Sequence, residues 1–61
     1  MMPEVFRAIR KGLGHTQQSL AGVLGVSTRA VQYYETGERK VPGPVARILI
    51  IMESEHASSE A

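Results

Sequence analysis

Cysteine is absent from this chain of 61 residues. Disulfide bonds and structural zinc sites with thiolate ligands, which stabilise many small domains, are therefore excluded. A chain of this length forms one domain and buries only about 60% of the surface that its unfolded form exposes, so its margin of stability is small. Stability must come from packing, from association with a partner, or from both.

Long apolar segments are missing as well. The longest apolar run, residues 48–52, is far shorter than the roughly 20 residues that a membrane-spanning helix needs. The N-terminus has no apolar core of the kind found in signal peptides, and the lack of cysteine fits a reducing compartment. We therefore expect a soluble, cytoplasmic protein.

A strong net charge is also missing, because the formal value at pH 7 is +1. The charges are nevertheless unevenly distributed. Residues 1–47 contain all seven Lys and Arg residues and three of the six acidic residues, whereas residues 48–61 contain three glutamates and no base. A basic body followed by an acidic tail is a weak indication of a polyanionic partner.

The first two predicted helices are short. Apolar side chains recur three and four residues apart after a proline that suits a first turn, which predicts a helix over residues 3–11. A second helix should begin at Gln17, because the hydroxyl of Thr16 can accept a hydrogen bond from a free amide of the first turn. It should end at Gly25 after about two turns, since glycine adopts the left-handed conformation at low cost.

The third helix should span residues 28–36, with Ser27 as its N-cap and Gly37 at its C-terminal end. At 100° per residue, one side of this helix is mainly apolar and should pack against the core. The opposite side is polar and free to bind a partner; its residues are Thr28, Arg29, Gln32, Tyr33 and Thr36.

A loop with two glycines and two prolines follows, and a fourth helix should run from Pro44 to about Glu53. Residues 54–61 have almost nothing to bury, so we expect a frayed acidic tail after a domain of residues 1–53. No segment shows the alternation of apolar and polar residues that is typical of a strand. The predicted fold class is all-α.

The segment Gly25-Val26-Ser27 joins two helices that are too short to be stable alone, and its length suits a pair that crosses at a steep angle. The small side chain of Ala21 fits such a crossing, because a bulky side chain would push the helices apart. The pattern predicts a helix-turn-helix.

With these residues the chain resembles the phage-repressor (Cro/XRE) helix-turn-helix family, including its small antitoxin-type and phage-type regulators. The resemblance covers about residues 5–52. It implies a compact repressor-like domain of four to five helices and a sequence-specific regulator of transcription, a repressor, associated with the nucleoid and of bacterial or phage origin. The residues that carry it are Thr16-Gln17, Leu20-Ala21, Leu24-Gly25-Val26-Ser27, Val31 and Glu35-Thr36-Gly37.

The resemblance also implies roles for individual residues. The first helix and the end of the third should be joined by a structural ion pair between Arg10 and Glu35. Arg29 is the strongest candidate for reading a base, because its guanidinium matches O6 and N7 of guanine. The base-reading residues would be Thr28, Arg29, Gln32 and Tyr33, and the phosphate-binding residues would be Thr16, Gln17, Ser27, Thr36, Arg39 and Lys40.

Several of these residues have a plainer interpretation. Arg29, Arg39 and Lys40 could be ordinary solvated charges, and Tyr33 could be a half-exposed packing residue. Glu38 departs from the family, which often has a base there, and its carboxylate weakens the case for a strong phosphate clamp in the following loop. Neither histidine has a second ligand at useful spacing, so we expect no metal, no cofactor and no enzymatic activity.

The fourth predicted helix is apolar on nearly every side. Val45, Ile48, Leu49 and Met52 should cover the helix-turn-helix, whereas Ile50 and Ile51 fall outside that face. We expect these two residues to form a homodimer interface, since two-fold dimers bind palindromic operators in double-stranded DNA. The alternative is a protein-binding module such as an antitoxin, with a toxin or another protein as partner; Arg29 in the third helix favours DNA.

Overall fold

A computed structural model describes the backbone of residues 1–60 and the side chains of residues 1–57. The described part contains helices and no strand, which confirms the all-α fold class. The helices are α1 (Pro3–Gly12), α2 (Gln17–Leu24), α3 (Thr28–Thr36) and α4 (Gly43–Glu60).

α2 and α3 each begin directly after a residue whose side chain caps the helix. The hydroxyl of Thr16 accepts a hydrogen bond from the amide of Ser19, and the Ser19 hydroxyl accepts one from the amide of Thr16. At the start of α3, the hydroxyl of Ser27 accepts from the amide of Ala30 at 3.1 Å. Each cap provides a hydrogen-bond acceptor for an amide that has none within its helix. The two caps thereby fix the residues at which α2 and α3 begin.

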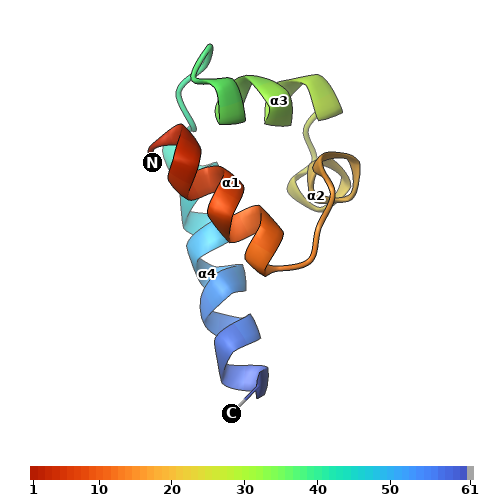
Figure 1. Ribbon diagram of the computed structural model, residues 1–61, viewed down its shortest axis with the longest axis vertical. Helices are drawn as coiled ribbons and strands as arrows, with labels where there is room; N and C mark the ends of the chain where they lie inside the picture. Colours follow the sequence, from red (N-terminus) through yellow and green to blue (C-terminus); the bar gives the residue numbers. More distant parts are fainter. Residues whose placement is uncertain (61) are drawn as a thin grey trace.

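The helices pack around one small core. α3 packs against both α1 and α2, and α1 also packs against α4. Figure 1 shows α1 and α4 side by side, with α3 at one end of the long axis of the molecule and the C-terminus at the other. The ring centroids of Phe6 and Tyr34 lie 5.6 Å apart, which joins α1 to α3. The buried side chains are Phe6, Ile9, Leu20, Ala21, Ala30, Val31, Tyr34 and Leu49.

The fourth helix differs from its prediction in two ways. It continues to Glu60 rather than ending near Glu53, because no glycine or proline interrupts the sequence after Met52. Ile48 does not cover the helix-turn-helix, because its side chain is 40% exposed whereas Leu49 is fully buried. In the described part of the chain, no helix combines the length and the apolar character that crossing a membrane requires.

Gly25 should be required for the turn between α2 and α3. Its φ of +73° lies in the left-handed region, so we expect Gly25→Ala to lower the free energy of unfolding by about 1–2 kcal/mol. Gly22 in α2 is the matched control, since a Cβ there meets nothing within 4 Å; Gly22→Ala should raise stability by about 0.5–1 kcal/mol. Urea denaturation measures both changes, and shifts in the same direction would contradict this account.

Candidate nucleic-acid interface

One side of α3 packs into the core and the other faces outward. Ala30, Val31 and Tyr34 are buried, while Arg29 and Gln32 are exposed and Thr28 and Tyr33 are half-buried. The four residues that the sequence predicts to read bases therefore share the outward side of one helix. Within the described part of the chain, the side chains of Arg29 and Gln32 make no hydrogen bond or ion pair, so their donors are free for a partner.

A partly buried polar network holds α3 against α1 and α2. Arg10 is paired with Glu35, with its Nε 2.5 Å and its Nη2 3.2 Å from the two carboxylate oxygens. Only 11% of the Arg10 side chain and 6% of the Glu35 side chain are exposed. A third donor of Arg10, Nη1, lies 2.9 Å from the carbonyl oxygen of His15, so the same guanidinium also fixes the loop before α2. The pair therefore sets the orientation of the helix-turn-helix relative to α1.

Gln17 belongs to this network. Its amide Nε2 donates to Oε1 of Glu35 at 3.2 Å, and its side chain is half-buried. The side chain is thus directed toward Glu35 rather than outward. An anion could instead bind the first backbone amides of α2, which have no acceptor within the helix. The positive end of the helix dipole favours an anion at the same place.

Thr16 and Ser27 lie at the starts of α2 and α3, and both are exposed. Each hydroxyl oxygen accepts a hydrogen bond from a backbone amide, at 3.0 Å for Thr16 and 3.1 Å for Ser27. Because a hydroxyl is both donor and acceptor, each can cap its helix and still donate its own proton to a phosphate oxygen.

The residues after α3 lie close to its outward side. The guanidinium of Arg39 stacks over the ring of Tyr33, 5.1 Å from the ring centroid. The Thr36 hydroxyl donates to the carbonyl oxygen of Tyr33 at 3.3 Å, and the amide of Glu38 donates to that hydroxyl at 3.4 Å. Arg39 and Lys40 are both exposed, so this segment presents two bases beside one carboxylate.

Sequence reasoning missed Arg7. It is exposed, and it lines a hollow between α1, α2 and α3 together with Gln17, Gln32 and Thr36. The signal was present in the sequence, because Arg7 precedes Arg10 by three residues and two residues at that spacing share a helix face.

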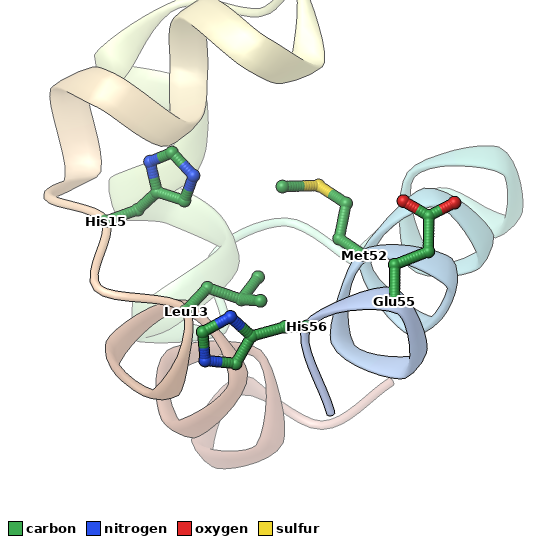
Figure 2. A pocket seen from close by; sticks show the side chains of 5 residues that line it. All are labelled: Leu13, His15, Met52, Glu55 and His56. Carbon is green, nitrogen blue, oxygen red and sulfur yellow. The ribbon is translucent and has the colours of Figure 1, made fainter. Parts of the chain in front are cut away.

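A second hollow lies between the loop that follows α1 and the C-terminal half of α4. Figure 2 shows its lining residues, with Leu13 and His15 on one wall and Met52, Glu55 and His56 on the other. Nδ1 of His15 lies 2.8 Å from the Ser19 hydroxyl, which places this histidine beside the cap of α2. Among residues 1–57, no cluster of three or more His, Cys, Asp or Glu side chains could hold a metal ion.

A steeply crossed pair of short helices, the second with its polar side outward, defines a helix-turn-helix domain. A helix-turn-helix family model of the Cro/C1 type matches residues 6–50, most of the chain. No curated protein and no solved structure gives a significant match. The chain belongs to this helix-turn-helix family, which confirms the resemblance to Cro/XRE proteins, and it is a DNA-binding helix-turn-helix regulator.

Proposed function

We propose that the protein is a sequence-specific transcriptional repressor that inserts α3 into the major groove of double-stranded DNA and binds a palindromic operator as a homodimer. The observation that carries this proposal is the outward side of α3, where Arg29 and Gln32 are exposed and have no partner in the described part of the chain. A helix fits the major groove of B-DNA, and both side chains suit base edges there.

The arrangement of charge supports the same orientation. α3 lies at one end of the long axis, and the last turns of α4 lie at the other (Figure 1). Glu53 and Glu55 are therefore held away from α3, whereas Arg39 and Lys40 lie in the segment that follows it, after Glu38. Acidic side chains near the DNA backbone would oppose binding, and this fold keeps Glu53 and Glu55 distant from α3.

Selection from a pool of random duplexes tests the proposal. The chain should enrich one sequence with two-fold symmetry, and it should protect the same sequence from cleavage in a footprint. Enrichment of no sequence, together with equal affinity for all duplexes, would contradict sequence-specific binding.

Arg29→Ala should weaken binding to the selected duplex by about 1–3 kcal/mol per half-site and relax the preference at one base pair of each half-site, because a bidentate contact to guanine is lost in each. The loss on random duplexes should be much smaller. Fluorescence anisotropy at fixed salt measures both affinities. Arg47→Ala is the control, since it removes the same charge from an exposed position on α4. An equal loss on selected and random duplexes would show that Arg29 contacts phosphate instead.

Exposed apolar residues on α4 support the homodimer. Ile48, Ile50 and Ile51 are 40%, 55% and 49% exposed, and all three lie on one helix of a small domain. A single recognition helix contacts only a few base pairs, and a two-fold dimer doubles the length of the recognised sequence. A second copy of the chain, packed against α4, covers the exposed isoleucines and supplies the second recognition helix.

A further inference from the structure

The hollow between α1, α2 and α3 contains an uncompensated positive charge. The charged residues that line it are Arg7, Arg10 and Glu35. Arg10 and Glu35 neutralise each other in a close ion pair, and the Glu35 carboxylate also accepts from Gln17. The side chain of Arg7 makes no hydrogen bond or ion pair within the described part of the chain. Its guanidinium therefore presents five N–H donors with no acceptor.

The rest of the lining suits an anion. Gln32 contributes an exposed amide from the helix proposed to enter the major groove, whereas the hydroxyl of Thr36 already donates its proton to the carbonyl oxygen of Tyr33. The start of α2, with its free backbone amides, lies on the wall formed by Gln17. The only carboxylate in the lining, that of Glu35, is already held by Arg10 and Gln17.

Arg7 also differs from three other arginines of the chain. Arg10 is fixed by Glu35, and Arg39 is stacked on Tyr33. Arg47 lines a separate hollow on α4 with Gly43, Pro44 and Ile48. Arg7 is thus an unpaired base in a hollow whose other wall carries residues of the candidate DNA-binding side.

We propose that Arg7 binds a backbone phosphate of double-stranded DNA in this hollow, between the start of α2 and the end of α3. The inference rests on the proposed function and adds to it a phosphate site on α1, a helix to which we otherwise assign only structural roles. The contact would be independent of base sequence, because a phosphodiester has the same charge and oxygens at every base step. It would fix the domain on the duplex while α3 contacts the bases.

The test compares Arg7→Gln with the wild-type chain on the selected duplex and on a random duplex of equal length, over a series of salt concentrations. Loss of one phosphate contact should reduce the slope of log affinity against log salt by about 0.9 for each protomer bound, which is about 1.8 for the homodimer, with a similar fold loss of affinity on both duplexes. Arg47→Gln is the matched control, because it removes the same charge from α4 and should leave the slope unchanged. The unfolding temperature of Arg7→Gln should equal that of the wild type, since the side chain is exposed and unpaired.

Two results would overturn the proposal. A salt slope equal to that of the wild type would show that Arg7 contacts no phosphate, and a loss confined to the selected duplex would assign it to base recognition. Both results require a wild-type chain that binds DNA. Failure of the wild type to bind either duplex would instead contradict the proposed function, so the two failures are distinguishable.

Discussion

Replacing Glu35 with alanine should lower the free energy of unfolding by about 3–5 kcal/mol, because it leaves the Arg10 guanidinium buried with a single acceptor, the carbonyl oxygen of His15. Small domains are stable by only about 5 kcal/mol or slightly more. The Glu35→Ala chain should therefore keep a free energy of unfolding of only about 0–2 kcal/mol near room temperature. Urea or thermal denaturation, followed by circular dichroism, measures the effect.

Two further variants distinguish the effect of an unpaired buried charge from the effect of any substitution of a glutamate near the end of α3. Glu38→Ala removes an exposed glutamate two residues after α3 and should change stability by less than about 0.5 kcal/mol. Replacing Arg10 by methionine and Glu35 by leucine together should cost less than Glu35→Ala alone, since no charge is then left unpaired. A wild-type melting temperature for Glu35→Ala would show that the pair contributes nothing to folding.

The starts of the short helices could be predicted because they depend on local chemistry. Thr16 and Ser27 each cap the helix that follows, and these hydrogen bonds span only three residues. Gly25 and Gly37 adopt the left-handed conformation at the helix ends. The family was recognisable for the same reason, since its motif consists of capping, turn and small core residues at fixed spacing.

Features that depend on how helices pack could not be predicted as well. Helical periodicity assigned Ile48 to the core, but the position at which α4 crosses its neighbours buries Leu49 and leaves Ile48 exposed. The same limit applies to the candidate site. The hydrogen bond from Gln17 to Glu35 joins residues eighteen apart in sequence, and the stacking of Arg39 on Tyr33 depends on the turn taken after α3.

The exposed isoleucines of α4 do not lie on a single face. Ile48 and Ile51 are three residues apart and share one side of the helix, whereas Ile50 is turned about 100° from Ile51. Complete burial of an isoleucine contributes roughly 1.5–3 kcal/mol, so burying what remains exposed on each contributes on the order of 1 kcal/mol. Two-fold symmetry counts each contribution twice, and the sum must exceed the cost of association.

Replacing Ile50 and Ile51 together with lysine should therefore convert a dimer into a monomer that binds one half-site weakly and loses cooperative binding to the palindrome. The single variants locate the interface: Ile51→Lys should dissociate the dimer more than Ile50→Lys if the side shared with Ile48 forms the contact. Val23→Lys is the control, because Val23 is an equally exposed apolar residue on α2, at 55%, and its replacement should leave the dimer intact. Sedimentation equilibrium measures the oligomeric state, and a wild-type chain that stays monomeric at high concentration, with and without palindromic DNA, would exclude this interface.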